Sequence, residues 1–186
     1  MTKAKRRPGV TKAQWLEAGL EKLREHGVSG VSVQELARSL GIAKAGFYWH
    51  FRDRDDLYRQ ILAFWAHELT EVVTNNPQVI ELEPRDRLIR IAEMILDHDL
   101  SRYEVPIRQW AMNDEEVAAA VRRVDRTRLD FVRRTFAEMG FEGDALEMRT
   151  MLFIGYHAFE RPMFTRISRK RLRAQIAHRV ELLTRP

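Results

Sequence analysis

The sequence has 186 residues, of which 45% are hydrophobic and 32% charged, and this composition is typical of a globular chain rather than a disordered one. It contains no cysteine, which excludes disulfide bonds and cysteine-bound zinc. No apolar run approaches the roughly 18 residues that a membrane span needs, and no apolar stretch follows the basic start as in a signal peptide. We therefore expect a soluble, cytoplasmic protein without a membrane partner.

The formal net charge is +5, and part of that charge lies at the start of the chain. The first twelve residues contain five cations and no acid, namely Lys3, Lys5, Arg6, Arg7 and Lys12. Such a basic arm suits contact with DNA phosphates or entry into a groove. The alternative is a solubilising terminus that contacts nothing.

Capping signals and apolar spacing predict that the first third of the chain is all helical. Thr11 and Gln14 form a capping box for a helix that ends at Gly27, and Ser32 and Glu35 form a second box for a helix that ends at Gly41. A short segment over 43–50 follows. Asp53 caps a longer helix that ends at 75–77.

The rest of the chain also has helical spacing. Residues 77–83 are expected to form a loop, and a helix resumes near Pro84. Ser101 and Glu104 suggest a further capping box, and the acids after Asn113 start a helix that runs to Gly140. The helix over 144–161 is apolar nearly all round and is broken by Pro162, and one more helix closes the chain.

The second and third segments form a helix-turn-helix pattern, because two short helices meet at Gly41. Phe47 and Phe51 are four residues apart and suit an inward anchor, which leaves Tyr48 and His50 to reach phosphates. Arg54 lies in the first turn of the next helix, where a cation opposes the helix dipole, and a phosphate there would relieve the conflict. In the alternative reading, Tyr48 and His50 only pack the helix-turn-helix segment against residues 53–57.

These segments resemble the DNA-binding signature of the tetracycline-repressor (TetR) family over residues 11–69. The resemblance rests on Ser32-Val33-Gln34-Glu35-Leu36-Ala37, Leu40-Gly41-Ile42-Ala43-Lys44, Phe47-Tyr48-Trp49-His50-Phe51 and Arg54-Asp55-Asp56-Leu57. A softer resemblance to the family's sensor domain covers 107–117. The resemblance to the family as a whole implies an all-α fold of about nine helices. A DNA-binding head would occupy 1–52, and a connecting helix plus a ligand-binding and dimerisation domain would occupy 53–186.

The resemblance also implies roles for particular residues. Ser32 would cap the second helix and contact phosphate. Tyr48, His50 and Arg54 would also contact phosphate. Lys44 and Gly46 would face the groove. The family often has Gly and then Ser or Thr where this chain has Ala45 and Gly46, so a hydroxyl contact is missing. Trp49 stands at a variable position and would contact a thymine methyl or the sugar-phosphate edge.

In the second domain the resemblance implies a ligand pocket and a homodimer interface. The candidate pocket residues are Met94, His98, Trp110, Phe153 and His157, for which the alternative is ordinary core packing. The candidate interface residues are Met148, Leu152, Tyr156, Phe159, Leu172, Ile176 and Val180. A second basic cluster at Arg166, Arg169, Lys170, Arg171 and Arg173 is either an anion site or the solvated start of a helix.

We therefore predict a dimeric, sequence-specific regulator that binds a palindromic double-stranded DNA operator and is released by a small apolar or amphipathic effector. One alternative is a DNA-binding regulator without an effector. Another is a helical metal-dependent enzyme, for which 97–99 and 67–68 offer metal-capable side chains. Neither group has the spacing of a helical metal site, and we expect no catalytic, metal or cofactor site.

Overall fold

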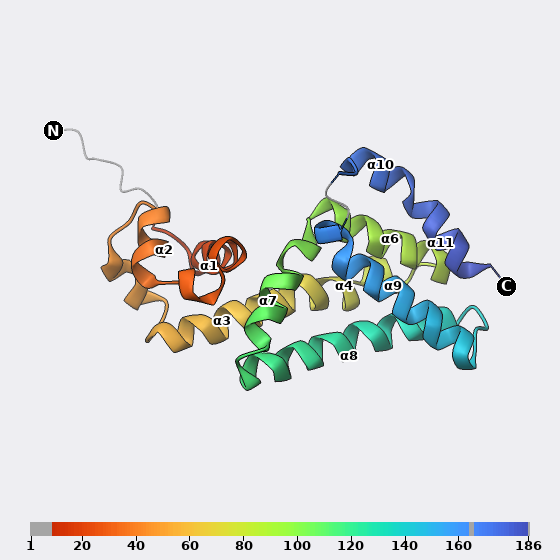
Figure 1. The fold of residues 1–186 in the computed structure, drawn as a ribbon, viewed down its shortest axis with the longest axis horizontal. Coiled ribbons are helices and arrows are strands. Elements are labelled where there is room, and N and C mark those ends of the chain that lie inside the picture. Colours follow the sequence, from red (N-terminus) through yellow and green to blue (C-terminus); the bar gives the residue numbers. More distant parts are fainter. Residues whose placement is uncertain (1–8, 164–165, 186) are drawn as a thin grey trace. The chain divides into compact units, whose positions relative to one another are not determined.

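The computed structural model describes residues 9–163 and 166–185, and within these ranges every regular element is a helix (Figure 1). The all-α prediction is confirmed. The chain forms two compact units, one ending at Phe64 and one beginning at Trp65. This boundary lies later along the chain than the predicted 52/53 division. The cations at positions 3, 5, 6 and 7 of the predicted arm lie outside the described residues.

The first unit contains α1 (Lys12–His26), the 3₁₀ turn η1 (Val28–Gly30), α2 (Val33–Ser39), the 3₁₀ helix η2 (Lys44–Trp49) and most of α3 (Arg54–Ala66). The first capping box is confirmed, because Thr11 and Gln14 exchange both hydrogen bonds. The second is only half formed. Ser32 Oγ accepts from Glu35 N at 3.2 Å, but the Glu35 carboxylate pairs with Arg38 instead of reaching back.

Aromatic packing forms the centre of the first unit. Phe47 and Phe51 stack with their ring centroids 5.1 Å apart, and the edge of Trp15 meets Phe47 at 5.6 Å. All three side chains are buried. At Gly19 a Cβ atom would lie 2.4 Å from Ile61 Cδ1, so glycine permits the close approach of α1 and α3.

The second unit begins with the end of α3 and the π-helical turn η3 (His67–Glu71). It continues through α4 (Val72–Thr74), α5 (Pro77–Ile80), α6 (Pro84–Asp97), the 3₁₀ turn η4 (Leu100–Tyr103) and α7 (Glu104–Ala111), and it ends with α8 (Glu115–Ala137), α9 (Gly143–Met163), α10 (Arg169–Ala174) and α11 (Ile176–Thr184). In Figure 1, α8 and α9 run side by side after a tight reversal, and α11 lies along α6. None of the described helices combines the length and apolarity that a bilayer span requires.

Three local predictions for this unit are wrong. The expected loop at 77–83 contains α5, which Asn76 caps and which buries Val79. The expected capping box at 101–104 is absent, because Ser101 lies in η4 and the Glu104 carboxylate pairs with Arg108, one turn along, and with the distant Arg128. Pro162 does not break α9, which ends at Met163, because a proline near a helix end removes only one backbone hydrogen bond.

The described chain has eleven α-helical segments, against about nine expected. The π-helical turn η3 divides one long helical stretch into α3 and α4, and a non-helical residue at Gln175 separates α10 from α11. Neither interruption contains a glycine or proline, so the sequence shows no signal for it.

Candidate functional site

The segment after Gly41 is a 3₁₀ helix throughout rather than the α-helix expected of a recognition element. Gly41 has φ +66°, and the chain then turns into bonds such as Gly46 N to Ala43 O at 3.0 Å and His50 N to Phe47 O at 2.9 Å. Short elements favour this tighter winding, and Gly46 lowers the α-helical propensity further. The winding matters because it decides which side chains of η2 point outward.

Three candidate DNA contacts lie exposed on η2. Tyr48 is 62% exposed and Trp49 is 87% exposed, whereas the neighbouring Phe47 is buried. Lys44 is also exposed, and its side chain makes no ion pair or hydrogen bond within the described residues. At Gly46 a Cβ would meet only Ile42 Cδ1, at an ordinary 3.6 Å, so the packing of the chain itself does not require glycine there.

His50 and Ser32 are partly engaged inside the head. His50 Nε2 lies 3.0 Å from the carbonyl oxygen of Val10, and because a carbonyl only accepts, Nε2 carries the proton. Ser32 Oγ accepts from the Glu35 amide, which leaves its hydroxyl proton to donate. Each residue therefore keeps one polar atom for a further partner: Nδ1 of His50 and the hydroxyl proton of Ser32.

Arg54 is held by a residue that sequence reasoning did not single out. Its Nε donates to the Tyr58 hydroxyl at 2.6 Å, and its guanidinium lies 4.9 Å from the centre of the Tyr58 ring. The same hydroxyl donates toward the carbonyl oxygens of Val28 and Val31, at 3.2 and 2.9 Å. The i, i+4 spacing of Arg54 and Tyr58 is the signal that could have found the pair.

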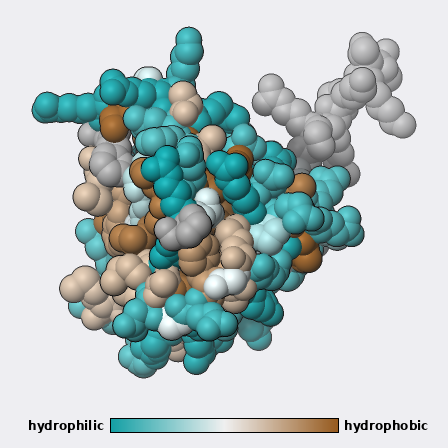
Figure 2. Space-filling model, turned by 90° about the vertical axis from the view of Figure 1, so that its right-hand side faces the viewer, coloured by the Kyte–Doolittle hydropathy of each residue, from teal (hydrophilic) through white to brown (hydrophobic). Residues whose placement is uncertain are grey.

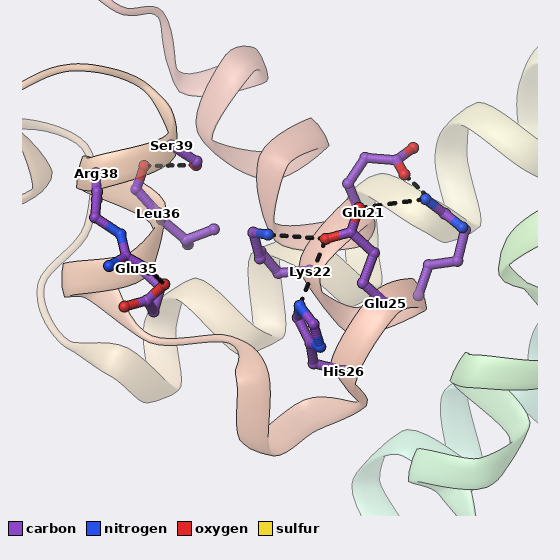
Figure 3. A network of polar contacts seen from close by, with 9 residues as sticks. Glu21, Lys22, Glu25, His26, Glu35, Leu36, Arg38 and Ser39 are labelled. Carbon is purple, nitrogen blue, oxygen red and sulfur yellow. Dashed lines mark hydrogen bonds and ion pairs between the residues drawn. The ribbon is translucent and has the colours of Figure 1, made fainter.

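Several exposed charges on α1 and α2 form ion pairs within their own helix (Figure 3). The pairs include Lys22–Glu25 and Arg24–Glu21, each at 2.8 Å, and Arg38–Glu35. Exposed pairs of this spacing contribute little to stability, because solvent screens them. They do reduce the positive charge that α1 and α2 present, which makes Lys44 more prominent in the head.

The second unit contains a cavity of about 60 Å³. Its walls come from η3, α4, α6, η4, α7, α8 and α9, and they include Ile91, Ile95, Phe131, Val132, Phe153 and His157. Of the candidate pocket residues, Phe153 and His157 therefore line the cavity. Met94 is buried in the core, His98 is exposed at the end of α6, and Trp110 is buried on α7 outside the lining.

One end of the cavity is polar, and sequence reasoning missed it. The buried Glu104 accepts from Arg128 Nη1 at 2.8 Å and from Arg108 Nη2 at 3.3 Å. Arg108 also makes two bonds to Asp125, at 2.7 and 2.9 Å, which raise the pKa of its guanidinium. Arg128 Nε donates to Thr70 Oγ1 at 2.9 Å. Only the Glu104–Arg108 pair has a local i, i+4 signal.

His157 is a second buried titratable group of the cavity and is 5% exposed. Its Nδ1 lies 2.8 Å from the carbonyl oxygen of Phe153, one helical turn back on α9. Burial lowers its pKa from 6.5 to about 4, so the imidazole is neutral near pH 7. Its Nε2 is buried and has no hydrogen-bond partner among the described residues.

The candidate interface residues divide into two groups. Met148, Leu152 and Phe159 are exposed on α9, and Tyr156 is half-buried beneath the guanidinium of Arg179. Leu172, Ile176 and Val180 are buried in the cores of the same chain, so in this structure they do not face a partner. In Figure 2, hydrophobic surface interrupts the hydrophilic surface on the side that carries the C-terminal end of the fold.

The second basic cluster is partly structural. Arg169 Nη2 donates to the carbonyl oxygens of Leu96 and Asp97 at the end of α6, and Arg173 pairs with the Asp97 carboxylate. Two of the five cations in this cluster therefore make contacts within the chain, and the Asp97 carboxylate is already paired. No group of three or more metal-capable side chains occurs within the described residues.

Comparison with known proteins bears on the head first. The profile "Bacterial regulatory proteins, tetR family" matches residues 16–61. The chain is 32% identical over 99 residues to the HTH-type transcriptional regulator AcrR of Shigella flexneri, which is 50% of this chain and 42% of that protein. It is 30% identical over 59 residues to the HTH-type transcriptional regulator SrpR of Pseudomonas putida, covering 32% and 28% of the two chains. The matches thus span less than half the length of each relative.

Solved structures resemble the whole fold. A transcriptional regulator from Rhodococcus sp. Rha1 superposes with a TM-score of 0.71 at 16% identity, over 94% of this chain and 96% of that one. The regulator FadR from Bacillus subtilis, solved with stearoyl-CoA, superposes with a TM-score of 0.70 at 16% identity, over 94% and 98% of the two chains. At this identity the likeness concerns the fold alone. Residues 16–61 of the chain thus carry the sequence signature of the TetR family of bacterial regulatory proteins.

Proposed function

We propose that the chain is a sequence-specific transcriptional regulator whose N-terminal unit binds double-stranded DNA. The observation that carries this proposal is the joint exposure of Lys44, Tyr48 and Trp49 on η2, inside the segment that the TetR profile matches. Tyr48 and Trp49 are neighbours and are both exposed, and adjacent exposed aromatic side chains are typical of an interaction surface.

The contacts divide by chemistry. Tyr48, the free hydroxyl proton of Ser32 and the guanidinium of Arg54 can donate to phosphate oxygens and would position the head without reading sequence. Nδ1 of His50 is an acceptor in this tautomer and would take a donor instead. Lys44 and Trp49 are the side chains that reach outward with groove chemistry, a donor for guanine and an apolar edge for a thymine methyl. Gly46 would let the backbone of η2 come close to the DNA between them.

The operator is expected to be palindromic, because the protein is proposed to act as a homodimer that reads half-sites about 34–36 Å apart. Support for the dimer comes from a stripe of exposed apolar side chains along α9. The stripe comprises Met148, Met151, Leu152, Phe159 and Met163. Gly155 lies within it, with open space around its Cα, so a second helix could approach closely there. Leu182 on α11 is exposed as well and would supply the second ridge.

The expected action is repression, with release by a small molecule that binds in the second unit. The cavity supports this, since its walls are largely apolar with a few polar groups. Its volume of about 60 Å³ is well below the roughly 300 Å³ of a typical ligand pocket, so binding requires the lining side chains to move. A coupling of about 1–3 kcal/mol between ligand and DNA would suffice.

The small cavity favours one alternative, a regulator that binds DNA without a small-molecule effector. A single experiment distinguishes the regulator with an effector from the regulator without one. Sites are selected from random DNA with the full-length protein, and gel shifts on the enriched site are then repeated with a panel of metabolites. Enrichment of a palindrome supports the regulator, and release by a metabolite supports the effector. Failure to enrich any sequence would overturn the proposed function.

A further inference from the structure

Two buried acceptor atoms in the second unit lack a donor. His157 Nε2 and Glu160 Oε1 are both buried and have no hydrogen-bond partner within the described residues. The two residues are one turn apart on α9 and belong to two cavities that share Ile95 and Ser101 in their walls. A buried acceptor without a donor costs about 1–3 kcal/mol, so a bound donor would be favoured at this place.

The protonation of His157 follows from its other nitrogen. The Phe153 carbonyl can only accept, so Nδ1 carries the proton and Nε2 offers a lone pair. Protonating Nε2 as well would bury a cation, and burial lowers the pKa of the ring to about 4. At neutral pH the cavity therefore presents Nε2 as an acceptor that cannot donate.

Glu160 extends the same chemistry into the smaller cavity, which has a volume of about 20 Å³. Its side chain is 3% exposed, and Oε1 lies 3.9 Å from Arg179 Nη2, beyond hydrogen-bond distance. Burial raises the pKa of this carboxyl group. Arg179 does not belong to the lining of either cavity.

The charges around the larger cavity are already matched. The cation that lines it, Arg128, is bound to Glu104 and to Thr70, and Glu104 is shared with Arg108. An anionic ligand would have to break one of these pairs, and a cationic ligand would face Arg128 across a narrow space. The lining thus favours a molecule without formal charge.

We propose that the cavity of the second unit binds a neutral, mainly apolar molecule that donates a hydrogen bond, from a hydroxyl or N–H group, to Nε2 of His157. The inference rests on the proposed function only in identifying this molecule as the effector. It distinguishes the chain from the stearoyl-CoA-bound neighbour, whose ligand is charged.

The test uses three small aromatic probes of similar size: phenol, anisole and benzoate. Each is titrated into the full-length protein, without DNA, by isothermal calorimetry. Phenol should bind about tenfold more tightly than anisole. Anisole lacks the hydroxyl donor and keeps only an ether oxygen, to which the Ser101 hydroxyl could donate. Benzoate should bind more weakly than phenol. Equal binding of phenol and anisole, tighter binding of benzoate, or no binding of phenol would each overturn the proposal.

A variant locates the contact. His157→Phe keeps a ring but removes the acceptor, so the preference for phenol over anisole should fall to about one. His98→Phe is the matched control, because His98 is exposed and outside the lining, and it should keep the preference. Should His157→Phe not fold, ¹⁵N NMR of the wild type replaces it. Addition of phenol should shift the Nε2 resonance of His157, and an unchanged resonance counts against the proposal.

These measurements are independent of DNA, and operator binding is measured separately by gel shift. A protein that binds phenol through His157 but no DNA sequence would leave the inferred site standing and refute the regulator. A protein that binds an operator but shows no preference for phenol would support the regulator and refute the inferred site.

Discussion

The candidate DNA contacts in and just after η2 differ in what they already contact inside the head, and this difference separates their expected roles. His50 is hydrogen-bonded to Val10 and Arg54 to Tyr58, so both would meet DNA from a fixed position. Tyr48 and Trp49 extend into solvent, so their contacts form only on binding. Fixed side chains lose little rotamer entropy on binding, whereas free ones lose more.

Tyr48→Phe should weaken binding to every DNA sequence by a similar factor, about 5- to 10-fold, because one phosphate hydrogen bond of roughly 1 kcal/mol is lost. Competition gel shifts with the selected operator and with unrelated DNA measure both affinities. The exposed hydroxyl makes no contact that folding needs, so the thermal midpoint should not change. A loss confined to the operator would show that Tyr48 reads bases instead.

Trp49→Ala should change the sequence preference at one position of each half-site, with a cost of about 1–3 kcal/mol for the preferred base. Stability should stay within about 0.5 kcal/mol of wild type, since the side chain is 87% exposed. Repeating the random-site selection with the variant gives the comparison. An unchanged consensus would exclude base reading by this residue.

The buried imidazole of His157 predicts a pH dependence of stability. Its pKa is lowered from 6.5 to about 4 by burial, so the unfolded chain takes up a proton at pH values where the folded protein does not. Unfolding is therefore favoured as the pH falls from about 6.5 toward 4, with a total loss on the order of 3 kcal/mol. The contribution is fully present above about 6.5.

Denaturant unfolding at a series of pH values, for the wild type and for His157→Phe at equal concentration, tests this point. The wild type should lose more stability than the variant between about pH 7 and pH 4. The difference between the two curves isolates His157 from the other groups, including Glu160. Parallel curves would show that the imidazole is not buried in its neutral form.

At the scale of elements, one buried arginine of α6 connects several segments of the second unit. Arg87 Nη1 contacts the Glu138 carboxylate at 2.9 Å and Thr135 Oγ1 at 3.4 Å. Its Nη2 donates to the carbonyl oxygens of Ile80 and Leu82, at 2.8 and 3.0 Å. A single side chain thus joins the end of α8 to the stretch between α5 and α6.

Arg87→Leu should destabilise the protein by about 2 kcal/mol, because two carbonyl groups and a carboxylate lose their donor. For a chain of this length the thermal midpoint should fall by roughly 4–8 °C. Arg90→Leu is the control. Its guanidinium is exposed and pairs with Glu93 at 3.7 Å, so the change should stay within about 0.5 kcal/mol. Equal effects of the two changes would refute the connecting role.

Element boundaries were predictable wherever the signal is local. Thr11, Asp53 and Asp114 cap the helices that follow them, each with a side-chain oxygen on a nearby backbone amide. Ser101 has the same local signal but a different outcome. The Glu104 carboxylate is buried and pairs with Arg108 on its own helix and with the distant Arg128 on α8, and the pairing with Arg128 outweighs a cap of about 1 kcal/mol.

At the scale of the whole molecule, the exposed apolar stripe of α9 predicts self-association. Leu152→Glu places a carboxylate on that stripe at a residue that is 53% exposed, and it should convert a dimer to monomers. Sedimentation velocity measures the change, and operator affinity should fall because each half-site is then bound separately. Met112→Glu is the control, since Met112 is 82% exposed but lies outside α9. A dimer that survives Leu152→Glu would place the interface elsewhere.

The sequence by itself determined the helical class, most helix starts and the helix-turn-helix segment, because caps, turn glycines and apolar spacing act over a few residues. The tertiary structure alone decided that Leu172, Ile176 and Val180 are buried within their own chain while Met148 and Leu152 are exposed. It also decided that Thr70, Glu104 and Arg128 meet at the polar end of one cavity. These outcomes depend on which helix faces pack together over long sequence separations, and a helical period alone does not specify the partner of an apolar face.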